Sequence, residues 1–409
     1  MKRIFDRIAS FVFAILFAST ILISSAAAAG ETENTLIPIS QTTVCPFNDT
    51  KDLWCEESVN ICYQAGILAG VTDTLFLPYS GLTNAQIIVI AARLLDKLSG
   101  GSGILESPSN AEHWYASAYQ YLQDAASNAG ITLSWSLANE PDKICYRRTF
   151  VKVLATVLTL SKTELPKLNS VSVLLDSYDP AIISFYQAGI LNGSDPYGCF
   201  QGLEDLNRGQ AAAILARIID PSLRLTFELP SVDLCRDIFQ LDPDMVLYSL
   251  GDTDYTVLQA APYICGIWGL DDYKAINVEE FFHYLSLSLS REQIAPRVLA
   301  QQCGIELSAE EQQEIYDSAQ LKNGYMGLPT KYWAGVDSTD KIMEHLRDYY
   351  SERFGTNQYG QTPELSLDLG ELGQYYGTQL TAKFDPSSID LLGIKNRLEE
   401  MPYCPFIFL

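Results

Sequence analysis

The chain has 409 residues, and 50 acidic against 27 basic residues give it a formal net charge of −23 at pH 7. A charge of that sign and size argues against a nucleic-acid partner and against binding to an anionic membrane surface. Hydrophobic residues make up 47% of the sequence, which excludes a disordered acidic tail. The length is sufficient for two or three globular domains.

Residues 1–29 have the composition of a secretory signal peptide. Three basic residues precede an apolar stretch over 8–23, and small residues follow at once. This order predicts export, with cleavage within Ala26–Ala29. An uncleaved N-terminal anchor helix is the alternative, although the apolar stretch is short for a membrane span. No later stretch is long and apolar enough to span a bilayer, so we expect no membrane association after cleavage.

A block of about sixty residues recurs three times in the first half of the chain. The sequence Tyr-Gln-Ala-Gly-Ile-Leu occurs identically at 63–68 and 186–191, and the middle copy keeps Asn-Ala-Gly-Ile at 128–131. The glycine of each block is expected to end a helix as a left-handed C-cap. These glycines are Gly66, Gly130 and Gly189. The three copies occupy residues 44–100, 107–162 and 171–222.

A second helix is predicted in each copy, and in two copies it begins with a recognisable cap. Thr83 and Gln86 in the first copy form the pattern of a capping box, and Asn207 and Gln210 repeat it in the third. Apolar residues at helical spacing continue both helices. In the middle copy Tyr146 stands at the capping position, so that helix lacks the side-chain cap.

These features resemble the S-layer homology (SLH) family. The family pattern runs from an acidic turn through Trp, Ala-Gly-Ile and Phe-x-Pro to a Thr-Arg-Ala-Glu-like helix start. The first copy supplies Phe47, Asp49, Trp54, Ala65, Gly66, Ile67, Gly70, Asp73, Phe76 and Pro78; the second His113, Trp114, Ala129, Gly130, Ile131 and the helix start 146–150; and the third Asp176, Ala188, Gly189, Ile190, Gly193, Phe200 and Arg208. Asp49 and Asp176 are expected to be structural, as Asx-turn acceptors ahead of the first helix.

The resemblance implies a mainly α fold. Three repeats would form a pseudo-threefold helical prism, which is followed by a second, mostly helical domain at 232–409. It also implies binding to secondary cell-wall polysaccharide, including pyruvylated sugars, without a metal or cofactor. The expected location is the cell wall or S-layer of a Gram-positive-type bacterium. Free N–H groups at a helix N-terminus and an arginine in its first turn would supply the donors for a sugar carboxylate.

Four residues are implied as polysaccharide contacts. Arg147 and Arg208 occupy the position of the motif's arginine, where the first copy has Asn84. Trp54 and Trp114 are the aromatic candidates for covering the apolar face of a sugar. An ordinary solvated charge is the alternative for each arginine, and a core position is the alternative for each tryptophan.

Residues 232–409 show no repeat. Amphipathic spacing predicts helices there, and Ser308 with Glu311 predicts a capping box. The predicted helices cover 278–285, 309–319 and 337–354. The stretch 277–354 is similar to the helical chaperone segment of exported peptidyl-prolyl isomerases of the SurA and PrsA type. The 55 residues after Phe354 contain no histidine and are too few for the isomerase domain itself.

No catalytic constellation stands out along the chain. The three histidines belong to no known catalytic motif, and the nine cysteines lack zinc-finger spacing, so we expect mostly free thiols with one or two disulfides. We therefore expect a non-enzymatic surface protein whose C-terminal domain contacts a protein partner. A wall-anchored chaperone or degenerate isomerase is one alternative. A wall-anchored hydrolase with two facing carboxylates is the other.

Overall fold

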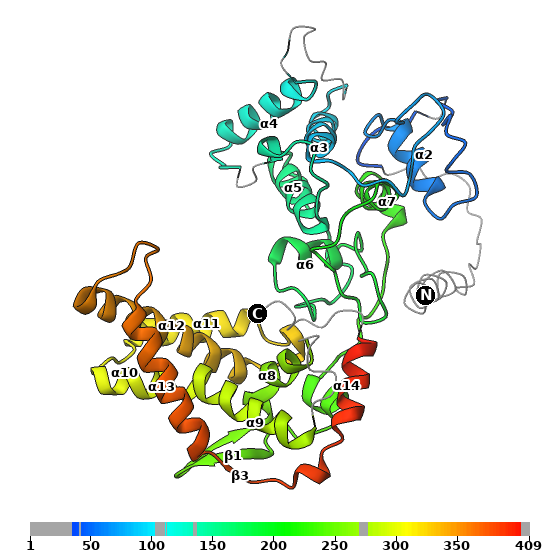
Figure 1. The fold of residues 1–409 in the computed structure, drawn as a ribbon. Helices are drawn as coiled ribbons and strands as arrows, with labels where there is room; N and C mark the ends of the chain where they lie inside the picture. The colour runs from blue at the N-terminus through cyan, green and yellow to red at the C-terminus, as the bar shows by residue number, and fades with distance from the viewer. Residues whose placement is uncertain are drawn as a thin grey trace. The chain divides into compact units, whose positions relative to one another are not determined.

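The computed structural model describes residues 35–40, 42–102, 111, 113–133, 137–269 and 277–401, so the predicted signal peptide lies outside the described residues. The chain divides into two compact units, which are considered one at a time. Unit 1 comprises 1–170, 184–196 and 201–228, and unit 2 comprises 171–183, 197–200 and 229–409. Figure 1 shows helices throughout both, which confirms the mainly α class. Among the described residues no helix has the length and hydrophobicity needed to cross a membrane.

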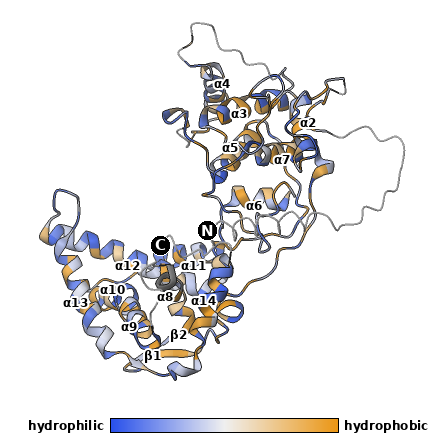
Figure 2. Ribbon diagram, turned by 45° about the vertical axis from the view of Figure 1, so that its right-hand side comes forward, coloured by the Kyte–Doolittle hydropathy of each residue, from blue (hydrophilic) through white to orange (hydrophobic). Residues whose placement is uncertain are grey.

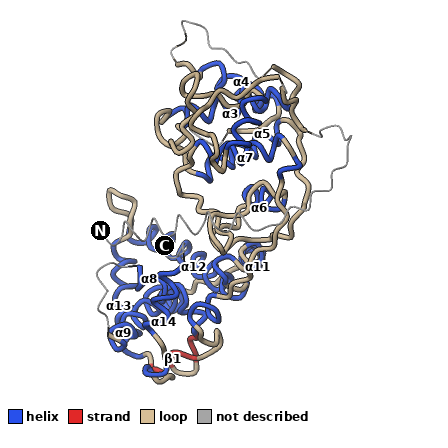
Figure 3. The backbone as a smooth tube through the Cα atoms, turned by 90° about the vertical axis from the view of Figure 1, so that its right-hand side faces the viewer, coloured by secondary structure: helices blue, strands red, loops and turns tan. Residues whose placement is uncertain are grey.

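Unit 1 consists of short helices joined by long loops, which Figure 3 draws in tan. The elements are α2 (Glu56–Gln64), α3 (Asn84–Leu98), α4 (Ala116–Asn128), η2 (Leu137–Asn139), α5 (Arg147–Leu160), α7 (Arg208–Ile219) and η3 (Pro221–Leu223), and α6 (Pro180–Gln187) crosses the boundary between the units. Helix α2 of the first copy packs against α7 of the third, and α4 of the second packs against α3 of the first. Helices from different copies therefore pack against one another, and the copies do not form separate domains.

The predicted helix ends are confirmed. Both capping boxes form, with the side chain of Thr83 accepting from the backbone N–H of Gln86 and Asn207 accepting from that of Gln210. The three C-cap glycines adopt φ values of +74°, +68° and +71°. At Gly189 a Cβ atom would lie 2.3 Å from the carbonyl oxygen of Leu225, so this position requires glycine for space as well as for conformation.

Unit 2 is a helical body with one small antiparallel sheet in the order β2-β1-β3. Its elements are η4 (Leu234–Phe239), β1 (Val246–Leu250), β2 (Thr253–Thr256), α8 (Val257–Gly269), α9 (Val278–Leu289), η6 (Ser290–Ile294), α10 (Ala295–Cys303), α11 (Ala309–Leu321), η7 (Tyr325–Gly327), α12 (Thr330–Phe354), α13 (Pro363–Gln379), β3 (Thr381–Ala382), η8 (Pro386–Ser388) and α14 (Leu391–Glu400). All three predicted helices are present, and α12 begins seven residues before its predicted start. Figure 2 shows that α12 is mostly hydrophilic, since few of its side chains enter the core.

Residues 171–183 of the third repeat belong to unit 2 and pack within it. The backbone N–H of Met326 donates to the carbonyl of Leu175 at 2.8 Å, and the ring of Tyr178 lies edge-on to that of Tyr325 at 5.0 Å. A half-buried ion pair between Lys322 and Asp337 lies next to these rings. The stretch 171–178 is therefore held by contacts that the repeat pattern does not predict.

The predicted free thiols are confirmed for the part of the chain that the structure describes, whereas the one or two expected disulfides are not found there. Five of the seven cysteines described there are buried and two are half-buried, and none of the seven forms a disulfide. Burial raises the pKa of Cys145 and of Cys235 to about 12, so neither is a thiolate at neutral pH. Their role is to fill the core.

We expect Glu311 to make unit 2 sensitive to acid. The predicted capping box forms at the start of α11, and the Glu311 carboxylate also lies 2.6 Å from the ring of His345. Bonds from the backbone N–H of Ser308, and then from His345, lower the pKa of Glu311 to about 2. Because the folded pKa is depressed, this stabilisation is complete above pH about 4.5 and is lost as the pH falls toward 2.

The substitution Glu311→Gln tests this dependence, because glutamine keeps the capping box but does not titrate. Urea unfolding at several pH values between 6 and 2 should show a smaller acid-induced loss of stability in the variant than in the wild type. Identical pH profiles for the two proteins would show that Glu311 is not the titrating group.

Candidate functional site

The three repeats meet in a closed ring of backbone hydrogen bonds. The N–H of Leu82 donates to the carbonyl of Leu206 at 3.0 Å, that of Leu206 donates to Cys145 at 3.0 Å, and that of Cys145 donates to Leu82 at 2.8 Å. Each residue lies just before the second helix of its own repeat, so the starts of α3, α5 and α7 converge at one point of unit 1. The sequence repeat is thus matched by an equivalent set of contacts in space.

The N-termini of these helices are already occupied by protein. The first two N–H groups of each helix donate to carbonyls of a neighbouring repeat, at 2.8–3.0 Å. The pairs are Asn84 to Lys143, Ala85 to Pro141, Arg147 to Glu204, Arg148 to Gly202, Arg208 to Ser80 and Gly209 to Pro78. The expectation that free N–H groups receive the sugar carboxylate is therefore wrong, because assembly of the repeats uses these donors.

The side chain at the first position of each helix also reaches into the neighbouring repeat. The amide nitrogen of Asn84 donates to the carbonyl of Glu140 at 2.9 Å, and a guanidinium nitrogen of Arg147 donates to the hydroxyl of Ser194. Arg208 makes the equivalent contact in the third copy. The motif's arginine position therefore joins one repeat to the next, even where it is asparagine.

Arg208 differs from the expectation of a surface contact. Its side chain is 6% exposed, and its guanidinium donates to the carbonyls of Phe76 at 2.7 Å and Ala69 at 2.6 Å. The guanidinium also stacks on the Phe76 ring, 4.4 Å from its centroid. Burial lowers its pKa without removing its charge at neutral pH. The prediction that Arg208 is exposed to a ligand is corrected: it holds the loop of the first repeat in place.

The two aspartates of the motif hold equivalent loops. Asp49 accepts from the backbone N–H groups of Phe76 and Leu77 at 2.9 and 2.7 Å, and Asp176 accepts from that of Phe200 at 2.9 Å. These bonds join residues 24 to 28 positions apart in the sequence. In each repeat the aspartate precedes the first helix and the donor N–H groups follow it. Both aspartates therefore have the predicted structural role, but through these longer-range connections.

Both candidate tryptophans lie at the surface. Trp54 is 57% exposed and Trp114 is 60% exposed, so the alternative of a core position is wrong for each. An atom of the Trp54 indole lies 3.2 Å from the position of a Cβ built on Gly209, which places this ring over the start of α7. Glycine there leaves room for the indole between the first and third repeats.

A pocket of about 390 Å³ lies at the start of α5, next to the first residue of α3. Three basic side chains and one acidic side chain line it, together with the half-buried Tyr146. The charged residues are Glu140, Lys143, Arg148 and Lys152. Lys143 pairs with Glu140 at 3.0 Å, whereas Arg148 is exposed and forms no ion pair within the described residues.

This pocket is a local positive site on a strongly acidic chain. The sequence analysis singled out Arg147 but missed Lys143, Arg148 and Lys152. The available signal was the density of basic residues over 143–152, where four cations occur in ten positions. Arg148 follows the motif's arginine and projects to solvent where Arg147 turns toward Ser194. An exposed guanidinium can still give two parallel bonds to a carboxylate.

Comparison with known proteins supports the resemblance. Residues 46–86 match the family model of the S-layer homology domain. The chain is 26% identical over 186 residues to exoglucanase XynX of Acetivibrio thermocellus, which covers 44% of this chain and 17% of that protein. It is 27% identical over 183 residues to amylopullulanase of Thermoanaerobacterium thermosulfurigenes, which covers 43% of this chain and 10% of that protein. The chain thus spans less than a fifth of either relative.

Proposed function

Because residues 46–86 form an S-layer homology domain, which indicates anchoring of a surface protein at the cell wall, we propose that this chain binds secondary cell-wall polysaccharide through its three repeats. The matched domain is the observation that carries the proposal. The attachment is non-covalent, and the C-terminal unit has a non-enzymatic role as an interaction domain for a protein partner. The cell wall is of the Gram-positive type.

The pocket at the start of α5 supports an acidic sugar as the ligand. Arg148 and Lys152 are exposed cations on the same helix, and Tyr146 offers a phenol beside them. A pyruvylated sugar carries a carboxylate, which an exposed guanidinium binds through paired charge-assisted bonds. The net charge of −23 on the whole chain repels a polyanion, so the carboxylates of the polymer are expected to bind at this local group of cations.

The exposed tryptophans supply a second kind of contact. An indole presents a flat apolar face with a polar N–H at its edge, which suits one face of a sugar ring. Trp54 lies over the start of α7 and Trp114 lies just before α4, so the two belong to different repeats of unit 1. Several weak sites on one body increase the affinity for a polymer through effective concentration.

The double variant Arg148→Ala, Lys152→Ala tests this assignment. We expect its affinity for purified cell-wall sacculi to fall about tenfold, equivalent to about 1.4 kcal/mol, in a co-sedimentation titration. Binding of the wild type should also weaken between 50 mM and 500 mM salt, because exposed charges are screened.

A matched control removes the same charge elsewhere. Lys51 and Lys167 are exposed lysines of unit 1 that do not line the pocket. The variant Lys51→Ala, Lys167→Ala should bind sacculi as the wild type does. Equal losses in both double variants would mean that net charge, and not the pocket, governs attachment.

A further inference from the structure

Besides the pocket in unit 1, the protein has a cavity of about 320 Å³ in unit 2. It lies between the β2–α8 connection and helices α10 and α12. Its size is at the lower end of small-molecule sites in proteins. Apolar and polar residues both line it, and the polar ones include Asp244, Asp254, Gln259, Arg297 and Lys331. None of these residues belongs to the repeats.

Arg297 is a half-buried cation of this cavity without an anionic partner. Its guanidinium donates one bond to the carbonyl of Gly335 at 2.9 Å, and it pairs with no carboxylate among the described residues. Its ionisable neighbours are the phenols of Tyr255 and Tyr263, whose pKa values are raised by burial, so both are neutral at neutral pH. A partly desolvated charge without a counter-ion is unfavourable, and an anion entering the cavity would relieve that cost.

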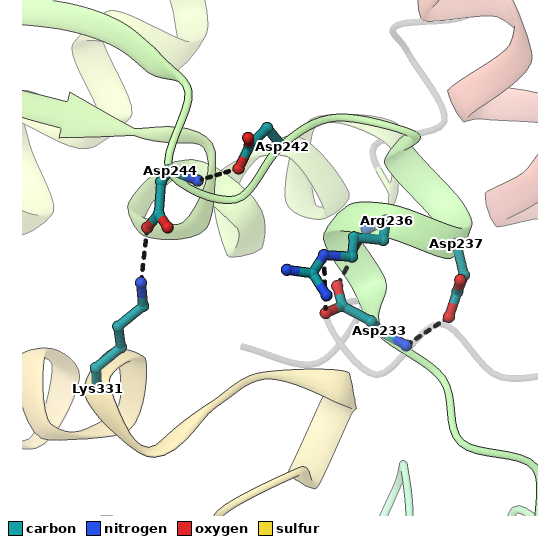
Figure 4. A network of polar contacts seen from close by, with 6 residues as sticks. All are labelled: Asp233, Arg236, Asp237, Asp242, Asp244 and Lys331. Atoms are coloured by element: carbon teal, nitrogen blue, oxygen red, sulfur yellow. Dashed lines mark hydrogen bonds and ion pairs between the residues drawn. The ribbon is translucent and has the colours of Figure 1, made fainter.

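The two carboxylates of the cavity differ in their partners. Figure 4 shows Lys331 of α12 reaching Asp244 in the loop before β1, and their charged atoms are 2.7 Å apart. Asp254 instead accepts a hydrogen bond from the neutral hydroxyl of Ser249 and forms no ion pair within the described part of the chain. Asp254 and Arg297 are not paired with each other. Within the described residues the cavity thus has a half-buried cation, Arg297, and an exposed carboxylate, Asp254, and neither forms an ion pair.

The remaining polar groups of the cavity are held in fixed positions. The side-chain amide of Gln293, 8% exposed, donates to the backbone carbonyl of Gln259 at 2.9 Å. The side-chain oxygen of Gln259 accepts from the backbone N–H of Thr256 at 2.8 Å. These bonds connect η6 with the start of α8, so the wall beside Arg297 is preorganised, which lowers the entropic cost of binding a small ligand.

We propose that this cavity binds a small zwitterion, an amino acid or dipeptide with a free carboxylate and a free ammonium group. The carboxylate contacts Arg297 and the ammonium group contacts Asp254. A dianion would be repelled by Asp254, and a simple amine would leave Arg297 without a counter-ion. Only a ligand with both charges satisfies both residues.

The test uses the full chain and three probes: alanyl-alanine, its C-terminal amide and its N-acetyl derivative. Titration calorimetry, supported by saturation-transfer NMR, should give an affinity for alanyl-alanine at least tenfold higher than for either blocked probe. Arg297→Gln and Asp254→Asn should each weaken the binding of alanyl-alanine at least tenfold. Arg236→Gln, which changes an exposed arginine of unit 2 outside the cavity, should have no effect.

Three results would overturn the proposal: no binding of alanyl-alanine at millimolar concentration, equal binding of the free and blocked probes, or unchanged affinity in both cavity variants. Circular dichroism must show that each variant is folded. If Arg297→Gln is not folded, the comparison of the three probes on the wild type, together with Asp254→Asn, decides the matter. These outcomes do not depend on wall binding, because every substituted residue belongs to unit 2.

Discussion

Arg208→Ala is expected to lower the free energy of unfolding of unit 1 by about 3 kcal/mol or more. The substitution leaves the buried carbonyl of Phe76 without its donor, which costs roughly 1–3 kcal/mol, and it also removes the bond to the carbonyl of the exposed Ala69. It also removes the stacking of the guanidinium on the Phe76 ring. Urea unfolding followed by tryptophan fluorescence measures the change.

Arg148→Ala is the matched control, because this arginine is the second residue of the equivalent helix in the second repeat and is exposed. Its effect on stability should be within about 0.5 kcal/mol. Arg208→Lys should recover only part of the loss, since an ammonium group cannot reproduce the planar fork that spans two carbonyls. An Arg208→Ala protein as stable as the Arg148→Ala protein would contradict a structural role.

Lys322→Ala is expected to have the largest effect in unit 2. The Lys322 ammonium lies 2.5 Å from the Asp337 carboxylate, and the two side chains are only 19% and 11% exposed. Removing the lysine leaves a mostly buried carboxylate without its counter-charge, which costs up to about 3 kcal/mol, the lower limit for a fully buried pair. It also removes the cation lying 5.6 Å from the centre of the Trp333 ring. Thermal and urea unfolding of unit 2 measure the loss.

The double variant Lys322→Met, Asp337→Leu distinguishes a charge effect from a packing effect. Apolar residues of similar volume remove both charges together, so its stability should be close to that of the wild type. Lys331→Ala breaks the exposed pair with Asp244 and should cost at most about 1 kcal/mol. Equal destabilisation by Lys322→Ala and Lys331→Ala would show that the Lys322 pair is not effectively buried.

The sequence predicted the local structure of the repeats well. Capping boxes and C-cap glycines are determined within four residues, so Thr83, Asn207 and Gly189 could be assigned from spacing alone. The partners of Arg208 and Asp49 could not, because they lie 27 to 139 residues away and are set by the packing of one repeat against another. The motif arginine was identified correctly, but its environment was not.

The sequence pattern also could not predict the small sheet or the packing of residues 171–178 in unit 2. Strand β3 is two residues long, and β2 is four, so neither gives a clear alternation. Trp54 was named as a candidate sugar contact, but its exposure could not be decided from the sequence, because tryptophan is usually buried and the indole's position depends on the distant Gly209. The basic pocket could not be predicted either, because its prediction requires knowing that the loop at 140–143 lies beside the start of α5.

Co-sedimentation of the full chain with two preparations of Gram-positive cell-wall sacculi tests the central claim most directly. One preparation keeps its secondary polysaccharide, and the other has been stripped of it by a treatment that leaves the peptidoglycan intact. We expect the chain to sediment with the intact walls and to remain in the supernatant with the stripped walls. Equal binding to both preparations, or no binding to intact walls from several sources, would contradict attachment through the polysaccharide.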